Sequence, residues 1–285
     1  MKIISINGEE VTPSLNGNPW DGDNDLFAKC VAYDEPERAQ ALGIYPFFRP
    51  IEEMDGAEVI CEGKRVLMVG SNNYLGLAND SRVVEAAVEA TRKYGLGCTG
   101  SRFLSGNLII HEQLEESLAD YIGKDAALLF STGYFANQGA LTSLFEEGDF
   151  ILCDKENHAS IIDGCRMSPA KIIPFAHNSP ESLRRRLSRL PAEAGKMVVI
   201  DGVFSMSGDI ARLAELMDVA GEFGAKFYVD EAHALGVMGE GGKGSAHHTG
   251  TADRADLMMG TFSKSLGCMG GFLAGDKDVI KFVRH

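Results

Sequence analysis

Short apolar runs alternate with amphipathic stretches from about residue 64 onward. The apolar runs predict β-strands at Lys64–Val69, Ala126–Phe130, Phe150–Cys153, Lys171–Phe175, Met197–Ile200, Lys226–Val229, Leu257–Gly260 and Gly271–Ala274. The stretches between them predict helices at Arg82–Tyr94, His111–Tyr121, Asn137–Leu144, Ser160–Cys165 and a segment that begins at Pro180.

Nearly continuous apolar strands separated by helices are typical of a mainly parallel sheet that helices cover on both faces, an α/β/α sandwich. Upstream of the sheet, the first twenty or so residues are rich in Gly, Asn and Pro and predict a loose segment, followed by a helix at Asp25–Leu42. We therefore expect an N-terminal arm and helix at 1–60 and one large domain at 61–285.

Composition narrows the class of partner. The chain has 285 residues, of which 45% are hydrophobic and 24% charged, as in an ordinary globular protein. Its formal net charge of −14 repels phosphate backbones and argues against nucleic acid as a partner. One basic cluster, Arg184–Arg186 with Arg189, is either a solvated helix face or a docking patch for CoA or an acyl carrier.

Cysteine usage and hydropathy indicate a cytoplasmic protein. The six cysteines are scattered without a C-x-x-C pair or metal-ligand spacing, so we expect reduced thiols and no metal site. The N-terminus has no charged region followed by an apolar one, and no apolar run reaches about 18 residues. We therefore expect neither a secretion signal nor an integral membrane segment.

The carboxyl ends of the predicted strands carry the polar residues of interest, because ligands bind at this edge of a parallel sheet. Gly133 and Tyr134 follow one strand and open a helix, an arrangement that suits a phosphate but also an ordinary turn. His158 follows the next strand, where a lone histidine is either structural or functional. Asp230 and His233 follow a third, and such groups are costly to bury without partners.

A lysine completes this set. The strand that ends at Gly260 leads into Thr261, Ser263 and Lys264. Pyridoxal phosphate (PLP) chemistry needs a lysine for the Schiff base, an acid that keeps the pyridine nitrogen protonated, a ring to stack on the pyridine, and hydroxyl and N–H groups for the phosphate. The chain supplies each of these at strand ends, so the pattern predicts a PLP site with Lys264 as the Schiff-base lysine.

A competing nucleotide motif is rejected. The segment 95–100 matches G-x-G-x-x-G, but a dinucleotide fingerprint follows a strand and opens a helix. This one follows the predicted helix Arg82–Tyr94, so we do not expect NAD.

Several longer stretches make a family resemblance specific. The chain from about residue 40 to 285 resembles the α-oxoamine synthases, a branch of the fold-type I PLP-dependent transferases. The stretches that carry the resemblance are SNNYLGL (71–77), GCTGSRFLSGN (97–107), HEQLEESLADYIGKDAALLFSTGYFAN (111–137), NHASIIDG (157–164), DGVFSMSGDIARL (201–213), VDEAHALGVMGEGGKG (229–244) and GTFSKSLGCMGG (260–271).

The resemblance implies a reaction. The family joins an amino acid to an acyl thioester with loss of CO2 and builds its sites across a homodimer interface. The segments 43–52, 163–168 and 175–191 resemble the soluble bacterial subgroup that joins L-serine to palmitoyl-CoA, giving 3-ketosphinganine, the first step of sphingolipid synthesis. Relatives that use glycine or alanine, of the 2-amino-3-ketobutyrate CoA ligase or 8-amino-7-oxononanoate synthase type, share the catalytic residues and remain an alternative.

The resemblance also implies residue roles. Lys264 would be the base at the substrate Cα, Asp230 would pair with the pyridine nitrogen, and His158 would stack on the ring and contact the substrate. The ring oxygen would be bound by His233 and Ser205. The phosphate would be held by Gly133, Tyr134, Thr261 and Ser263, and Asn73 and Ser101 would line the substrate entrance.

The chain ends at His285, before the C-terminal small domain that the resemblance implies and before its substrate-binding arginine. We therefore expect the chain to bind PLP more readily than it completes a condensation. A truncated, non-catalytic subunit of the same fold remains a second alternative, although the presence of Lys264 argues against it. The stretches 97–107 and 230–244 argue against an aminotransferase or a decarboxylase.

Overall fold

The computed structural model describes residues 3–4, 10–11 and 26–285. Most of the predicted loose segment lies outside these residues. The chain forms two compact units, one made of Met1–Met54 and Glu58–Leu67 and the other of Asp55–Ala57 and Met68–His285. The predicted domain boundary after residue 60 falls within a strand of the first unit and stays a prediction.

The first unit holds short elements. Its helices are α1 (Ala28–Val31) and α2 (Glu35–Ala41), and its strands are β1 (Ile3–Ile4), β2 (Glu10–Val11), β3 (Ile51–Asp55), β4 (Glu58–Cys61) and β5 (Lys64–Leu67). The single helix predicted at 25–42 is wrong, because two helices occupy the described part of this range. Pro36 lies in the first turn of α2, and a proline inside a longer helix would clash with the preceding turn and remove a hydrogen bond.

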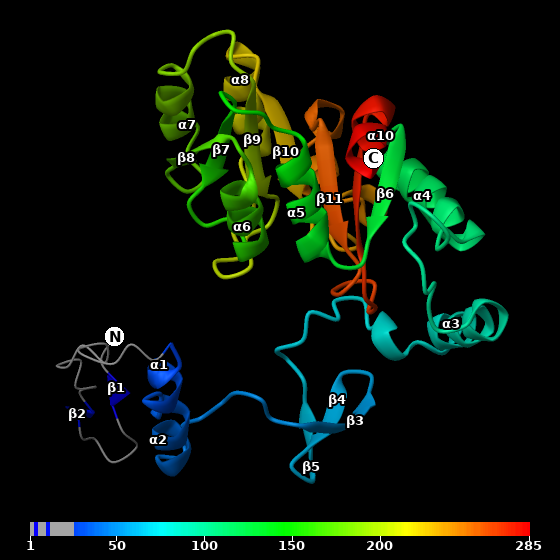
Figure 1. Ribbon diagram of the computed structural model, residues 1–285. Helices are drawn as coiled ribbons and strands as arrows, with labels where there is room; N and C mark the ends of the chain where they lie inside the picture. Colours follow the sequence, from blue (N-terminus) through cyan, green and yellow to red (C-terminus); the bar gives the residue numbers. More distant parts are fainter. Residues whose placement is uncertain (1–2, 5–9, 12–25) are drawn as a thin grey trace. The chain divides into compact units, whose positions relative to one another are not determined.

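The second unit is built on a seven-stranded sheet with the order β6-β12-β11-β10-β9-β7-β8 (Figure 1). Only β12 runs antiparallel to its neighbours, so the predicted mainly parallel sheet is confirmed. The strands are β6 (Ala126–Phe130), β7 (Phe150–Asp154), β8 (Lys171–Phe175), β9 (Lys196–Asp201), β10 (Lys226–Asp230), β11 (Leu257–Thr261) and β12 (Gly271–Gly275).

Helices cover both faces of this sheet, as the sequence predicts. One face packs against α4 (Ile109–Ile122), α7 (Pro180–Leu187) and α8 (Leu213–Glu222). The other packs against α5 (Gly133–Ser143), α6 (Ala159–Met167) and α10 (Lys277–Arg284). The unit also contains α3 (Ser81–Tyr94) and α9 (Ser245–His248), with short 3-10 turns at Leu77–Asn79, Glu240–Gly242 and Ala252–Arg254.

Two cores explain why the strands are apolar throughout. Side chains alternate between the faces of a strand. In β9, Val198 and Ile200 therefore enter the core with α8, whereas Met197 and Val199 enter the core with α5. Because both faces are buried, the strand shows a continuous apolar run.

The start of α5 and the end of α3 bear on function. Helix α5 begins at Gly133, four residues before the predicted start, because the Thr132 side chain caps it by accepting a hydrogen bond from the N–H of Phe135. The G-x-G-x-x-G segment follows α3, whose C-terminal cap is Gly95. It therefore lacks the strand that a dinucleotide fingerprint requires.

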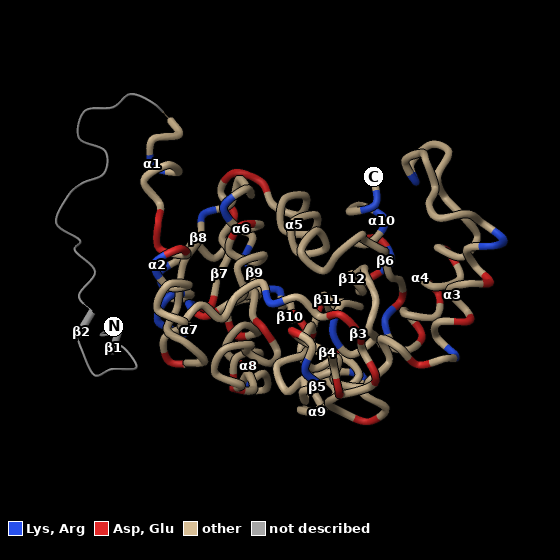
Figure 2. Tube along the Cα trace, turned by 90° about the horizontal axis from the view of Figure 1, so that it is seen from below, with Lys and Arg blue, Asp and Glu red and all other residues tan. Residues whose placement is uncertain are grey.

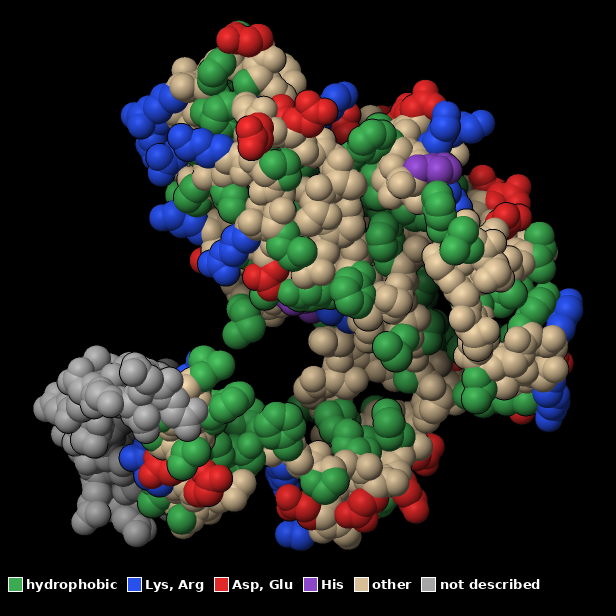
Figure 3. All heavy atoms as spheres, in the orientation of Figure 1, with side chains coloured by type: hydrophobic (Ala, Val, Ile, Leu, Met, Phe, Trp, Pro, Cys, Tyr) green, Lys and Arg blue, Asp and Glu red, His purple; other side chains and the backbone are tan. Residues whose placement is uncertain are grey.

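Charged side chains are spread over the elements of the chain. Acidic and basic residues are interspersed along the chain in Figure 2, and a group of Lys and Arg side chains covers α7 in Figure 3. Within that group, Arg184 pairs with Glu222 on α8, as expected of a solvated helix face. The six cysteines are free thiols. Among residues 26–285 no helix is long and apolar enough to cross a membrane.

One histidine just after the end of β8, His177, contacts three carboxylates. His177 Nδ1 lies 3.0 Å from Asp154 Oδ1, and Nε2 lies 3.2 Å from Asp209 Oδ2 and 3.7 Å from Glu156 Oε2. Burial lowers the pKa of His177, but the hydrogen bonds with Asp154 and Asp209 and the charge of Glu156 outweigh it, so the pKa is raised above its usual 6.5.

This cluster predicts a pH-dependent stability. A raised folded-state pKa stabilises the fold below pH 6.5, and that contribution is lost as the pH rises through the folded-state pKa. We expect His177→Gln to lower the free energy of unfolding by about 1 kcal/mol at about pH 6 and by less at about pH 9. Denaturant unfolding of both proteins at the two pH values measures this difference, and an equal or larger loss at the higher pH would contradict it.

Candidate active site

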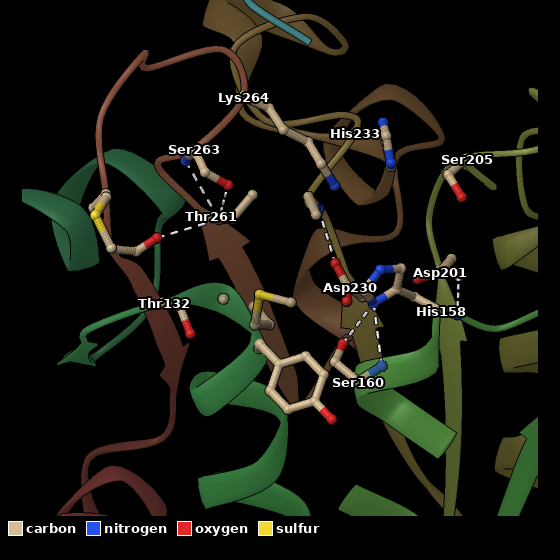
Figure 4. Close-up of a pocket in the computed structure, with 16 residues that line it drawn as sticks. Thr132, His158, Ser160, Asp201, Ser205, Asp230, His233, Thr261, Ser263 and Lys264 are labelled. Carbon is tan, nitrogen blue, oxygen red and sulfur yellow. Dashed lines mark hydrogen bonds between the residues drawn. The ribbon is translucent and has the colours of Figure 1, made fainter. Parts of the chain in front are cut away.

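A cavity of about 260 Å³ opens at the carboxyl ends of the central strands (Figure 4). Its lining residues lie at or shortly after the ends of β6, β7, β9, β10 and β11. These residues are Thr132, Gly133, Tyr134, His158, Ser160, Asp201, Ser205, Asp230, Ala232, His233, Met259, Thr261, Ser263, Lys264, Met269 and Gly270.

One end of the cavity suits an anion. The first N–H groups of a helix have no partner within it, and no described residue accepts from those of Gly133 and Tyr134 at the start of α5. Next to them, the hydroxyls of Thr261 and Ser263 lie 2.9 Å apart. A Cβ at position 133 would lie 2.8 Å from the Cβ of Thr261, so only glycine lets the helix start approach these hydroxyls.

A carboxylate lies deeper in the cavity. Asp230 is 2% exposed. Its Oδ2 accepts a hydrogen bond from Asn137 Nδ2 at 2.8 Å, and its Oδ1 accepts one from the N–H of Ala232 at 2.9 Å. Burial raises the pKa of Asp230, while these two donors and the charge of Lys264 offset part of the rise. The result is an oriented, buried acid.

Lys264 extends into the cavity from the turn after β11. Burial lowers the pKa of its amine, and the charges of Asp230 and Asp201 oppose this only in part. The neutral amine is the nucleophilic and basic form, so this setting favours reactivity.

His158 lines the same cavity as the two acids Asp201 and Asp230. Its backbone N–H donates to Asp201 Oδ2 at 2.8 Å, and its ring Nδ1 lies 2.7 Å from Ser160 Oγ. Burial, and then the charge of Asp230, raise the pKa of Asp201 well above its usual range. Burial raises the pKa of both acids, so the pair as a whole is shifted toward protonation.

His233 faces the same cavity and is held by a residue that the sequence did not single out. Its Nδ1 lies 2.7 Å from the hydroxyl of Tyr74. Burial, followed by the charges of Lys264 and His158, lowers the pKa of His233 to about 4. The imidazole is therefore neutral at physiological pH and acts as a hydrogen-bonding group rather than a charge.

The structure brings most of the predicted site residues together. The cavity lining includes Gly133, Tyr134, His158, Ser205, Asp230, His233, Thr261, Ser263 and Lys264. Asn73 and Ser101 are not in that lining. Asn73 Oδ1 accepts from the N–H of Ala78 at 3.3 Å, and Ser101 Oγ accepts from the N–H of Phe103 at 3.2 Å. Their role toward a substrate stays a prediction.

Sequence reasoning assigned no role to several residues at this site. Asp201 ends β9, and Ser160 lies two residues after His158 in the first turn of α6. The available signals were the position of Asp201 at a strand end and the nearness of Ser160 to His158 in the sequence. Asn137 and Tyr228 carry only the weaker signal of polar groups in buried elements, which need partners.

Known proteins are similar to this chain in sequence and in fold. Residues 64–285 match the family model for aminotransferase class I and II. A serine palmitoyltransferase of Sphingobacterium spiritivorum is 53% identical over 260 residues, which cover 91% of this chain and 65% of that protein. An 8-amino-7-oxononanoate synthase of Thermoanaerobacter pseudethanolicus is 43% identical over 250 residues, covering 87% of this chain and 63% of that protein.

A solved structure agrees. The serine palmitoyltransferase of S. paucimobilis with a bound PLP–myriocin aldimine superposes with a TM-score of 0.87 at 40% identity, covering 91% of this chain and 66% of that one. The chain thus spans slightly less than two thirds of the length of the relatives that it matches. The chain belongs to the aminotransferase class I and II family, and its relatives assign it to the α-oxoamine synthases.

Proposed function

We propose that the chain is the PLP-binding part of an enzyme that condenses L-serine with palmitoyl-CoA to give 3-ketosphinganine. The observation that carries the proposal is one cavity that combines Lys264, Asp230 and the anion-binding start of α5. The higher identity to the serine palmitoyltransferase than to the 8-amino-7-oxononanoate synthase favours serine over alanine or glycine. The glycine- and alanine-using reactions remain the alternative that the experiment below separates.

The residues present fit PLP. Its phosphate matches the free N–H groups of Gly133 and Tyr134 and the hydroxyls of Thr261 and Ser263. Its aldehyde matches the amine of Lys264, and its pyridine nitrogen matches the buried carboxylate of Asp230. When bound, PLP supplies an electron sink for the negative charge that develops at the amino acid Cα.

Asp230 and Lys264 perform the central proton chemistry in this proposal. The donors Asn137 and Ala232 hold the Asp230 carboxylate in one orientation, so that it can pair with a protonated ring nitrogen. Lys264, whose pKa burial lowers, takes the proton from the substrate Cα. Its fixed position in the cavity avoids much of the entropy cost of a bimolecular encounter.

The two histidines have orienting roles in this proposal. We propose that His158 stacks on the cofactor ring and contacts the substrate, and that the neutral His233, with Ser205, binds the ring oxygen. In the overall reaction, the serine Cα loses its proton and bonds to the acyl carbon, and CoA leaves as a thiol. The carboxyl group then leaves as CO2, and Cα regains a proton.

We propose that the enzyme works in the cytoplasm, in line with its free cysteines, as a homodimer in the first step of sphingolipid synthesis. CoA or an acyl-carrier protein delivers the acyl group. Asn73 and Ser101 line the substrate entrance.

The substrate is tested directly. The purified chain is incubated with PLP, palmitoyl-CoA and either serine, glycine or alanine, and thiol release and product mass are recorded. We expect PLP binding in each case and, because the chain is expected to bind PLP more readily than it completes a condensation, a small release of thiol that requires serine and gives the mass of 3-ketosphinganine. Product from glycine or alanine alone would replace the serine assignment by the alternative. PLP binding without any product from the three amino acids would agree with weak condensation by this chain and would count against a catalytically complete unit.

A further inference from the structure

Asn137 lies at the centre of a buried hydrogen-bond network beneath the cavity. It is fully buried on α5, as is Tyr228 on β10. The Tyr228 hydroxyl donates to Asn137 Oδ1 at 2.7 Å. Asn137 Nδ2 lies 2.8 Å from both Ser160 Oγ and Asp230 Oδ2. One amide thus contacts two elements of the site.

The orientation of this amide follows from its partners. Burial raises the pKa of Tyr228 well above its usual range, so its hydroxyl keeps a proton to donate. A reversed amide would place its oxygen against the carboxylate of Asp230, which repels it. In the observed orientation each of the two amide hydrogens has one acceptor, Ser160 or Asp230.

The hydrogen bonds of Ser160 determine which ring nitrogen of His158 carries the proton. Ser160 Oγ accepts from Asn137, and among the described residues the one other hydrogen-bond partner of this hydroxyl is His158 Nδ1, 2.7 Å away, so its hydrogen is directed there. The backbone N–H of Ser160 also donates to this Nδ1 at 3.2 Å. Two donors that converge on one nitrogen require a lone pair there, so a neutral ring must carry its proton on Nε2.

We propose that Tyr228, Asn137 and Ser160 form a positioning relay that sets His158 to the Nε2–H tautomer. No described residue hydrogen-bonds to Nε2, and His158 lines the cavity. The relay therefore presents an N–H donor to a ligand in the cavity, suited to an acceptor such as the carboxylate of an amino acid. The same amide orients Asp230, which couples the acid and the histidine through one side chain.

The inference rests on the proposed function only for what His158 contacts. The tautomer itself exists in the protein without cofactor or substrate. It is read by NMR from the ¹⁵N shifts of both ring nitrogens in histidine-labelled protein at about pH 9, where a histidine ring is neutral. A His158→Gln variant identifies the signals of His158 among the seven histidines.

The relay predicts a defined series of results. The parent should show an unprotonated Nδ1 and a protonated Nε2 at His158. Ser160→Ala removes one donor and should move the tautomer ratio roughly five- to tenfold toward Nδ1–H. Ser160→Thr keeps a hydroxyl and should restore the parent ratio, and Asn137→Ala should shift the ratio in the same direction as Ser160→Ala.

Two outcomes would overturn the relay. One is a proton on Nδ1 of His158 in the parent, which is read without any substitution in the relay itself. The other is a ratio that Ser160→Ala leaves unchanged in a protein whose circular dichroism matches the parent. Failure of the chain to condense serine with palmitoyl-CoA would leave both readouts intact, so the relay and the proposed function fail separately.

Discussion

Lys264→Ala is expected to abolish the change in visible absorbance that PLP shows when it is added to the parent chain. Lys264 is the amine that lines the cavity, and burial lowers its pKa toward the reactive neutral form. Loss of a positioned general base alone costs about 10²–10⁴-fold in rate, so any thioester consumption should fall at least that far. Absorbance titration with PLP and a thiol-release assay measure the two effects.

A matched control is Lys277→Ala. Lys277 is an exposed lysine in the first turn of α10, outside the cavity lining. This variant should bind PLP as the parent does. An absorbance change that survives in Lys264→Ala, or one that both variants lose, would contradict the assignment of Lys264.

Asp230→Asn is expected to lower kcat/KM by about 10²–10³-fold, the size of effect that follows loss of one oriented electrostatic group in an active site. Two donors, Asn137 Nδ2 and the N–H of Ala232, converge on this carboxylate. An asparagine loses the charge and also places its own NH2 group against one of these donors. Steady-state thiol release over a range of serine concentrations measures the change.

Asp201→Asn provides the comparison for this prediction. Both acids line the cavity, and burial raises the pKa of both. They differ in their contacts: Asp230 is the acid proposed to pair with the ring nitrogen, whereas Asp201 accepts from the backbone N–H of His158, a hydrogen bond that an asparagine oxygen can also accept. The loss should therefore be much smaller than for Asp230→Asn, and equal losses would show that shape rather than charge matters at these positions.

The sheet could be predicted closely because its strands are buried on both faces. The predicted bounds of β6 and β8 match the structure, and β7, β9, β10 and β11 differ by a residue or two. The direction of β12 could not be predicted, because an apolar run carries no information on orientation. Its antiparallel pairing with both β6 and β11 depends on the return of the chain through residues 262–270, where the N–H of Phe262 donates to the carbonyl oxygen of Gly270.

Helix α8 and strand β3 were not predicted from the sequence. Helix α8 was missed although Leu213, Leu216, Met217 and Ala220 recur at helical spacing and are buried. Strand β3 was missed because all its residues are exposed, so it lacks the apolar alternation of a half-buried strand. Neither element lines the cavity.

Most of the site was predictable from the rule that ligands bind at the carboxyl ends of parallel strands. Residues such as Asp230, His233 and Lys264 stand directly after apolar runs. The network around Asn137 was not predictable, because its partner Tyr228 is 91 positions away in the chain and Asp230 is 93. Such contacts depend on how α5 packs on the sheet, which no local pattern encodes.

The central claim is that Lys264 is the residue that binds PLP covalently. The most direct measurement is to incubate the chain with PLP, reduce it with borohydride, digest it and map the modified peptide by mass spectrometry. We predict that the added pyridoxyl mass lies on Lys264, at about one group per chain. Modification spread over surface lysines, with Lys264 unmodified, would contradict the account.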